Sequence, residues 1–389
     1  MLTTCIAALL LFPSGPAESP VPETAPAVPE HLICRDDRQQ VDPDVTRDAA
    51  SFSEGDSLLV LFWNLENFFD WRDEGGGEAD REFSAAGPRH WTRRRFMAKA
   101  SAIAKTLLWT AGESGALPDI FAVAEVENAF VLRMLLQETA LRKTDYAYVH
   151  FDSPDRRGID TALLYRRSRL RLRDARPVRV TASRDGDTLH TRDILIARFE
   201  TAAGQPWTIL VNHHPSKFGG GSTAWKREAA VERLRSLTDS LIRTGDERVI
   251  ATGDFNDTPD APVFRRLTDP AESFSEREPF PASFRTDRVP ADGTAALVNL
   301  AGPLARRGLG TIRYEGNWEL IDMFFIPPAL ARRCTMEILA PSFLTVRDNV
   351  HSGDRPFRTW LGPRYIGGVS DHRPILLRIT PPQNPSRTD

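Results

Sequence analysis

The sequence of 389 residues contains no apolar run as long as the roughly 18 residues of a membrane-spanning helix, so no transmembrane span is expected. An excess of either charge is also missing, because 50 basic and 53 acidic residues give a net charge of −3. Composition therefore carries no global signature of nucleic-acid binding, although a local basic face stays open. With 41% hydrophobic residues, disorder throughout is excluded, and the length fits one large domain or two ordinary ones.

Cysteine is scarce, with three in the whole chain, and one of them lies in an apolar N-terminal segment. Cys5 to Phe12 is apolar and precedes small residues and prolines, which is typical of a signal peptide cleaved after Ala17. The basic residues that normally open a signal peptide are missing. We expect residues 1–17 to be a signal peptide and the protein to be secreted or periplasmic. Removal of the signal peptide would leave Cys34 and Cys334, either as a disulfide or as two separate thiols.

Residues 18–55 are rich in proline, alanine and acidic residues, and this composition predicts a linker without a core. One α/β domain is predicted over residues 56–381, followed by a tail at 382–389. Apolar runs predict strands at 57–64, 119–126, 146–151, 161–165, 194–199, 208–212, 248–252, 320–326 and 374–379. Apolar periodicity predicts helices at 92–110, 129–142 and 223–243.

Several predicted strands end on polar residues, which is where α/β folds place their sites. Asn64 follows the first apolar strand, where its amide could bind a carboxylate or a phosphate-bound water, or could cap the strand. Glu125 ends the second strand, where an unpaired carboxylate would be costly. Either a divalent cation or a salt bridge to an arginine would remove that cost.

Arg157 and Asp160 precede the strand at 161–165. Arginine can bind phosphate through two parallel hydrogen bonds. The alternative is a turn in which Asp160 binds the local backbone. His213 and His214 follow another strand, and neighbours in a strand point to opposite faces. We therefore expect one of them to enter the site and donate a proton to phosphate or to a leaving group.

The string Gly253-Asp254-Phe255-Asn256-Asp257 follows a further apolar strand. Alternation places Asp254 and Asn256 on one face, where they could hold and orient an attacking water, with Phe255 in the core. A simple turn around the aspartate is the alternative.

Asp322 lies in a late apolar strand, and Asp371-His372 precede the last one. A carboxylate that is hydrogen-bonded to an imidazole fixes the tautomer of the ring and raises the pKa of the ring. The sequence has no phosphate-binding glycine loop, no dinucleotide-binding glycine pattern and no activated serine or cysteine. The chemistry expected is metal-assisted hydrolysis by water, most naturally at phosphorus.

Taken in order, these residues resemble the endonuclease/exonuclease/phosphatase superfamily, which has the deoxyribonuclease I-like fold. The most specific pieces are GDFND and SDHRP, and the resemblance runs from about Leu58 to Ile379. It is closest to exported bacterial members with motifs similar to NLENFF, AEVEN and NHWPS. Here NHHPS replaces NHWPS, so His214 stands where tryptophan is usual.

The resemblance implies a four-layer α–β–β–α sandwich of two mixed sheets with the site at one rim. It implies Mg²⁺, with Mn²⁺ or Ca²⁺ as alternatives, bound by Glu125 beside Asn64, and Asp371 at a second metal position. The remaining residues would be catalytic. Asp254 would be the base, and Asn256 would be the amide that orients the water. His213 would donate to the phosphate, and His372 would be the imidazole held by the carboxylate of Asp322.

The expected function is a metal-dependent phosphodiesterase, most simply a monomeric nuclease acting on DNA or RNA, with substrate contacts from Arg157, Asp160 and Lys217. Further basic residues that would bind phosphate non-specifically are Arg93, Arg94, Arg95, Lys99 and Arg227. For the run at 93–95 the alternative is a solvated helix start. The alternative functions are a phosphatase, a lipid or small-molecule phosphodiesterase, and a catalytically inactive binding module. A lipid-cleaving enzyme would need a membrane-docking loop, for which 269–296 is the candidate.

Overall fold

The computed structural model describes residues 57–75, 77–217, 220–268 and 297–381, all within one compact unit. The expected signal peptide, the linker at 18–55, Cys34 and the loop at 269–296 lie outside the described residues. Export and a Cys34–Cys334 disulfide therefore stay predictions. Within the described ranges, no helix is both long and apolar enough to cross a membrane.

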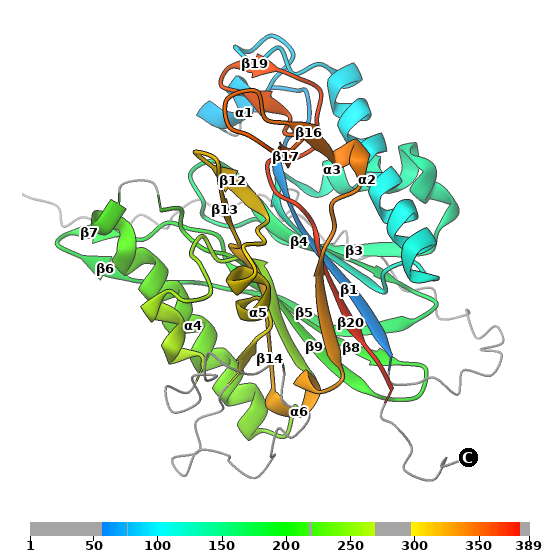
Figure 1. Ribbon diagram of the computed structural model, residues 1–389, viewed down its shortest axis with the longest axis vertical. Helices are drawn as coiled ribbons and strands as arrows, with labels where there is room; N and C mark the ends of the chain where they lie inside the picture. Colours follow the sequence, from blue (N-terminus) through cyan, green and yellow to red (C-terminus); the bar gives the residue numbers. More distant parts are fainter. Residues whose placement is uncertain (1–56, 76, 218–219, 269–296, 382–389) are drawn as a thin grey trace, which may run out of the picture. The chain divides into compact units, whose positions relative to one another are not determined.

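The first sheet consists of β1 (Leu58–Phe68), β2 (Ile120–Val126), β3 (Tyr146–His150), β4 (Asp160–Arg166), β15 (Cys334–Ile338) and β20 (Ile375–Ile379). Their spatial order is β15-β20-β1-β2-β4-β3 (Figure 1). β1 runs parallel to β2, whereas β20 and β4 run antiparallel to these two strands. The sheet is therefore mixed.

The second sheet consists of β5 (Leu170–Val178), β8 (Ile194–Thr201), β9 (Pro206–His213), β10 (Val249–Asp254), β11 (Val298–Asn299) and β14 (Asp322–Ile326). Their order is β11-β14-β10-β9-β8-β5. β9 and β10 are parallel, and the other pairs are antiparallel. Small ribbons are formed by β6 (Ser183–Arg184) with β7 (Asp187–Thr188), β12 (Ile312–Tyr314) with β13 (Asn317–Glu319), β16 (Thr345–Arg347) with β17 (Asp354–Pro356), and β18 (Trp360–Leu361) with β19 (Arg364–Tyr365).

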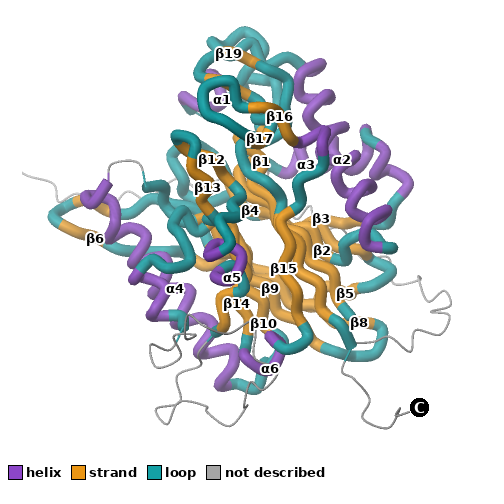
Figure 2. The backbone as a smooth tube through the Cα atoms, viewed as in Figure 1, coloured by secondary structure: helices purple, strands orange, loops and turns teal. Residues whose placement is uncertain are grey.

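Helices lie on the outer faces of the two sheets (Figure 2). The longer ones are α2 (Arg93–Ser114), α3 (Ala129–Glu138) and α4 (Ala224–Arg243); the short ones are α1 (Glu78–Glu82), α5 (Gly302–Arg306) and α6 (Pro328–Ala331). The Thr92 side chain caps the start of α2, and Gly115 ends it in the left-handed conformation. Asn128 caps α3 by accepting hydrogen bonds from two backbone N–H groups.

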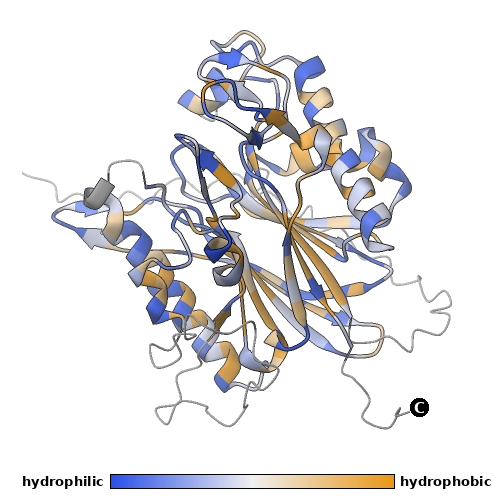
Figure 3. Cartoon of the chain, viewed as in Figure 1, coloured by the Kyte–Doolittle hydropathy of each residue, from blue (hydrophilic) through white to orange (hydrophobic). Residues whose placement is uncertain are grey.

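Alternation along the strands separates three apolar layers, which follow the apolar stretches coloured in Figure 3. In β1, Leu59, Leu61 and Trp63 pack with α2 and α3, whereas Leu58, Val60 and Phe62 pack against the second sheet. The outer face of the second sheet packs on α4 through Leu210, Val231, Leu234 and Ala251. Two buried sheet faces and two helix layers make the expected four-layer α–β–β–α sandwich, which is confirmed.

Every strand expected from an apolar run is present, with ends shifted by a few residues. β5 and β15 were not predicted, because exposed charged side chains in β5 and alternating exposure in β15 interrupt their apolar pattern. The helix expected at 129–142 is wrong at its C-terminal end. α3 stops at Glu138, and Thr139 caps a separate 3₁₀-helix, η2 (Ala140–Lys143).

Candidate active site

The same alternation explains which polar residues meet at one end of the sandwich. Asn64 continues the face of β1 that carries Leu58, Val60 and Phe62, so it points toward the second sheet. His213, Asp254 and Asp322 occupy the corresponding face of their own strands. Asp254 pairs with His213 on β9 and with Asp322 on β14. Residues that are far apart in sequence therefore meet between the two sheets.

Asp254 is a buried carboxylate at the centre of this group. Its Oδ2 accepts a hydrogen bond from Nδ2 of Asn64 at 2.9 Å, and its Oδ1 accepts one from the backbone N–H of Asn256 at 2.9 Å. Burial raises the pKa of Asp254 to about 7, with an opposing contribution from the nearby His372. A carboxylate with this pKa can act as a base near neutral pH.

His372 and Asp322 form a buried pair beside Asp254. Nδ1 of His372 lies 2.8 Å from Oδ2 of Asp322, and Nε2 lies 3.8 Å from Oδ2 of Asp254. Burial opposes the charge on His372, but Asp322 and then Asp254 outweigh it and raise the pKa of the imidazole well above its usual value. This direction favours the charged ring, and its free edge faces Asp254.

His213 and His214 point to opposite sides of β9, and His213 is the one in the site. Its Nε2 lies 3.7 Å from both Oε1 of Glu125 and Oδ2 of Asp254. Burial, followed by the charge of Arg192, lowers the pKa of His213 well below its usual value, so the ring is neutral. His214 instead packs edge-on against Phe255, and burial lowers its pKa to about 3.

Arg192 holds the backbone beneath these histidines. It donates to the carbonyl oxygen of His213 at 3.2 Å and to that of His214 at 2.6 Å. Asn256 has a positive φ of 51°, so it leaves the strand, and its Nδ2 also donates to the His214 carbonyl at 3.0 Å. Phe255 lies in the core as expected. Asn256 is thus tied to the strand end that carries His213.

Glu125 reaches the site through a break in strand geometry. Phe121 and Val123 face the helices, so simple alternation would aim Glu125 the same way. Instead Glu125 has a φ of 62°, and the register of β2 shifts after Ala124. Its Oε2 accepts a hydrogen bond from the backbone N–H of Asn67 at 2.8 Å. This irregularity brings its carboxylate to the rim.

Glu66 is a site residue that sequence reasoning missed, although it stands two positions after Asn64. Its buried carboxylate accepts a hydrogen bond from the backbone N–H of Thr359. Burial, and then repulsion by Asp371, raises its pKa to about 7. Strand alternation gave no reliable signal for it, because Glu66 has a φ of 48° and the register of β1 shifts between Asn64 and Phe68.

Lys99 was expected among the basic residues that bind phosphate non-specifically, which requires an exposed side chain, and that expectation is wrong. The side chain is buried, and Nζ donates to the carbonyl of Glu66 at 2.6 Å and to Oγ1 of Thr359 at 2.9 Å. Burial lowers the pKa of Lys99 to about 8. The periodicity of α2 did not reveal this, because the segment containing Thr359 covers the residue from 260 positions away.

The other basic residues expected to bind phosphate are mostly engaged elsewhere. Lys217 pairs with Glu319 at 3.1 Å and with Asp257 at 3.3 Å. Arg227 is buried and also pairs with Asp257 at 3.3 Å. Arg95 donates to the carbonyl oxygens at positions 89 and 90. Arg93 and Arg94 stay exposed at the start of α2, so these contacts reduce the basic face that motivated a nucleic-acid substrate without removing it.

Asp160 and Arg157 are separated by the structure. Asp160 accepts a hydrogen bond from the backbone N–H of Ser153 at 2.9 Å and lies 3.1 Å from Nε2 of His150, so it organises its own loop. Arg157 remains about half exposed and lies 4.0 Å from Oε1 of Glu125. Arg157 thus lies at the site, whereas Asp160 supports the loop that carries it.

The site opens into a cleft of about 300 Å³. Its charged lining comprises Glu66, Glu125, Arg157, Arg358, Asp371 and His372. Phe83, Arg89 and Trp360 form one wall, where Arg89 lies 4.9 Å above the Trp360 ring and donates to the carbonyl of Gly362 at 2.8 Å. The lining is therefore mainly ionic, with one aromatic wall.

The carboxylates at the cleft suit a divalent cation. Glu66, Glu125 and Asp371 line it together, and carboxylate oxygens are the ligands that such ions prefer. Asn64, expected beside the cation, instead bridges Asp254 and the backbone N–H of Glu66.

A second arrangement could also hold a metal. Ligand atoms of Asp254, Asp322 and His372 lie within 4.8 Å of one another. Oδ1 of Asp322 has no partner among the described residues, but Nδ1 of His372 is already bound to Oδ2 of the same carboxylate. Glu66, Glu125 and Asp371 lie on the cleft and leave His372 bound to Asp322, but they form a less compact group than Asp254, Asp322 and His372.

Known proteins were compared with the chain. A model of the Endonuclease/Exonuclease/phosphatase family matches residues 59–381. No curated protein matches the sequence at a significant level. Similar solved structures include a Bacteroides thetaiotaomicron mannosyl-6-phosphatase (15% identity, TM-score 0.49, 82% of this chain and 98% of that one) and the human Nocturnin catalytic domain with bound sulfate (18%, 0.47, 83% and 94%). Another is D. rerio TDP2 complexed with single-strand DNA product (16%, 0.47, 84% and 99%).

Proposed function

The chain belongs to the endonuclease/exonuclease/phosphatase family, and from that premise we propose that it is a metal-dependent hydrolase that uses water to cleave a phosphoester bond. One observation carries the proposal. A carboxylate with a pKa of about 7, Asp254, lies 3.8 Å from an imidazolium, His372, which Asp322 holds at 2.8 Å. A base and a cationic donor at this separation can act on a water and on the phosphoryl group that it attacks.

In the proposed reaction Asp254 accepts a proton from the attacking water while Asn64 and the backbone of Asn256 hold its two oxygens. His372 donates to a phosphoryl oxygen and stabilises the charge that develops there. The neutral ring of His213, on the other side of Asp254, supplies a further N–H to the phosphate. Each residue is held by a second protein group, which reduces the reorganisation required during the reaction.

The residues fitted to hold a divalent cation are Glu66, Glu125 and Asp371. When bound, such an ion would polarise the phosphoryl oxygen as a Lewis acid. We propose Mg²⁺ as the cation, with Mn²⁺ or Ca²⁺ as alternatives, because hard oxygen ligands suit these ions.

For the substrate we propose a phosphodiester of DNA or RNA as one class and a small phosphoester as the other. Membership of the family supports both. The small phosphoester is favoured by the cleft volume of about 300 Å³ and by the pairing of Lys217 and Arg227 with Asp257. Export and a monomeric state also belong to this proposal, and the apolar segment before Ala17 is what supports export.

The test is to incubate the purified protein with plasmid DNA, RNA, bis-p-nitrophenyl phosphate and p-nitrophenyl phosphate. Each substrate is run with Mg²⁺, Mn²⁺, Ca²⁺ or EDTA, beside the Asp254→Ala variant. We expect metal-dependent cleavage of at least one substrate, and loss of that cleavage in the variant. Cleavage that survives both EDTA and Asp254→Ala would overturn the proposed function. Plasmid nicking would select the nuclease, and cleavage of the small esters alone would exclude it.

A further inference from the structure

Two arginines, Arg157 and Arg358, approach the cleft from different parts of the chain. Arg157 lies in the loop before β4, and Arg358 lies in the segment before β20. In the first sheet, β1 and β2 lie between β20 and β4. The two loops therefore flank, from opposite sides, the strands that carry Glu66 and Glu125.

Both guanidinium groups remain accessible, more so than Arg89, which lines the same cleft and is 24% exposed. The Arg157 and Arg358 side chains are 48% and 37% exposed, whereas Arg192 is 6% exposed. Arg157 contacts carboxylates at long range, 3.7 Å to Asp155 and 4.0 Å to Glu125. These distances leave its N–H groups available for an anion.

Arg358 is also oriented by acidic groups of the cleft. Nη2 donates to Oδ2 of Asp371 at 3.0 Å, and Nε lies 3.5 Å from Oε1 of Glu66. Nε makes no hydrogen bond to any of the described residues but is itself buried, so the donors available to a ligand are those on Nη1 and Nη2. The guanidinium is thus held at the cleft with donors to spare.

We propose that Arg157 and Arg358 form a clamp that selects a small phosphomonoester, whose terminal phosphate carries two negative charges, over a phosphodiester. The inference rests on the proposed function and names its substrate class. A diester offers two non-bridging oxygens and one charge at phosphorus, whereas a monoester offers three terminal oxygens. Two guanidinium forks together with His372 supply more donors than two oxygens can accept.

The small size of the substrate follows from the wall of the cleft. Trp360 and Phe83 are buried within the wall, and Arg89 is tied to both Glu82 and the Gly362 carbonyl. The cleft of about 300 Å³ accommodates a phosphate with a small alcohol beside this wall. In the reaction the water oxygen bonds to phosphorus and one water proton passes to Asp254. The bond to the ester oxygen breaks, the departing alkoxide takes a proton from solvent, and Asp254 returns its proton to solvent.

Two model esters with the same leaving group test the clamp, p-nitrophenyl phosphate and bis-p-nitrophenyl phosphate. The wild type should have the higher kcat/KM for the monoester. Arg157→Met and Arg358→Met should each lower kcat/KM for the monoester by about 10- to 100-fold, as expected for lost charge-assisted hydrogen bonds, and change the diester by less than about threefold. Arg358→Lys should recover part of the loss, because it keeps the charge but not the fork. Arg364→Met, an exposed arginine of β19 outside the cleft, is the matched control.

Two results overturn the clamp: preference of the wild type for the diester, and an equal loss of kcat/KM on both esters in the arginine variants.

Calorimetry with phenylphosphonate and its monomethyl ester adds a readout that needs no turnover. The dianion should bind more tightly, and each Arg→Met change should remove that preference; equal binding of the two ligands overturns the clamp. If neither the two esters nor a nucleic acid is cleaved, the proposed function fails, while binding of the two phosphonates still tests the clamp. Release of phosphate from a sugar monophosphate but not from a 5′-phosphorylated oligonucleotide supports a small substrate, and the reverse overturns that part.

Discussion

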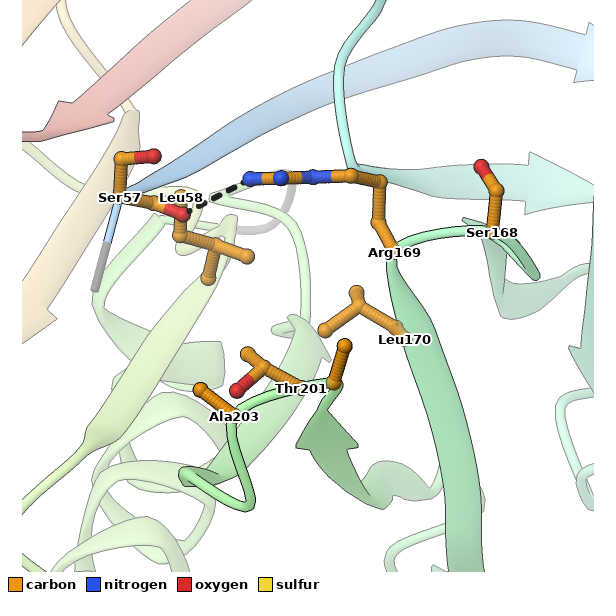
Figure 4. A pocket seen from close by; sticks show the side chains of 8 residues that line it. Ser57, Leu58, Ser168, Arg169, Leu170, Thr201 and Ala203 are labelled. Carbon is orange, nitrogen blue, oxygen red and sulfur yellow. Dashed lines mark hydrogen bonds between the residues drawn. The ribbon is translucent and has the colours of Figure 1, made fainter. Parts of the chain in front are cut away.

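Two buried aspartates at opposite ends of the sandwich have similar environments but different partners. Asp119, just before β2, accepts a hydrogen bond from the backbone N–H of Leu59 at 3.0 Å and another from Nε of Arg169 at 2.9 Å. Arg169 continues to the carbonyl of Ser57, beside a pocket of only about 20 Å³ (Figure 4). Asp254 at the other end has amide donors but no arginine, and it faces two histidines near an open cleft.

Burial raises the pKa of both Asp119 and Asp254. A perturbed pKa therefore does not by itself mark a functional group. What distinguishes them is that Asp119 binds Arg169, whose guanidinium also binds the carbonyl of Ser57, whereas Asp254 faces two titratable histidines. The first arrangement suits stability, and the second suits proton transfer.

The largest expected effect separates these two carboxylates. Asp254→Asn should lower turnover by about 10²- to 10⁴-fold, because the base is lost while its shape remains. The free energy of unfolding should not fall, since burial already disfavours the charged form of Asp254. Turnover is measured on the ester that the wild type cleaves, and stability by denaturant unfolding.

The matched control is Asp119→Asn. It removes the partner of Arg169, a side chain that is 23% exposed, so the loss of stability should be about 1–3 kcal/mol. Turnover per folded molecule should stay within about twofold. If Asp119→Asn abolished turnover in folded protein, the contrast between the two ends would be wrong.

The next largest effects are expected for His372 and its partner Asp322. His372→Ala should reduce turnover by about 10²- to 10⁴-fold. Asp322→Asn should reduce turnover by less, because the imidazole stays in place and loses only the carboxylate that stabilises its positive charge. Steady-state kinetics on the wild type and both variants provide the measurement. A His372→Ala protein that kept more than a tenth of wild-type turnover would contradict the assigned role.

Removing the divalent cation tests the carboxylates that line the cleft. EDTA should stop cleavage, and Mg²⁺ at 100 times its dissociation constant should stabilise the folded protein by about 2.7 kcal/mol. Glu66→Gln should weaken this stabilisation, whereas Asp119→Asn should not. Thermal unfolding with and without Mg²⁺ gives the comparison, and an identical response in Glu66→Gln would exclude Glu66 as a ligand.

The pH dependence should follow Asp254. Turnover should rise as pH increases through about 7, because the carboxyl must lose its proton to act as a base. Asn64→Leu should move this limb to higher pH, since the amide that favours the charged form is lost.

Stability should change in the opposite direction. The folded pKa of Asp254 exceeds its usual value of 3.8, so its contribution is complete at low pH and declines as pH rises toward 7. Pairs of unfolding curves for wild type and Asp254→Asn isolate this contribution. A wild-type minus variant difference that did not change with pH would contradict the raised pKa.

The smallest effect is expected at Lys217. The side chain is 41% exposed and already pairs with Glu319 and Asp257, so Lys217→Met should change kcat/KM by less than about threefold. A steep loss of nucleic-acid cleavage, together with a weaker dependence of cleavage on salt, would instead show that Lys217 binds the substrate.

Much of the site was predictable because it follows from strand alternation. Asn64, His213 and Asp254 sit two or four residues beyond apolar positions of the same face, and Asp322 begins such a face. Glu125 was predicted as a strand-end carboxylate, but its turn toward the site depends on a φ of 62° that no periodicity signals. Which of His213 and His214 faces inward depended on the side of β9 that meets the other sheet.

The sequence by itself determined the α/β class, most strands and the polar set at their ends, because these depend on the local spacing of apolar residues. Tertiary structure alone decided that Lys99 is buried under Glu66 and Thr359, that Lys217 is paired, and that Arg358 stands opposite Arg157. Those outcomes arise from contacts between segments up to hundreds of residues apart. Burial and pairing at such positions depend on which distant segment packs there, and the local spacing of apolar residues does not indicate which segment that is.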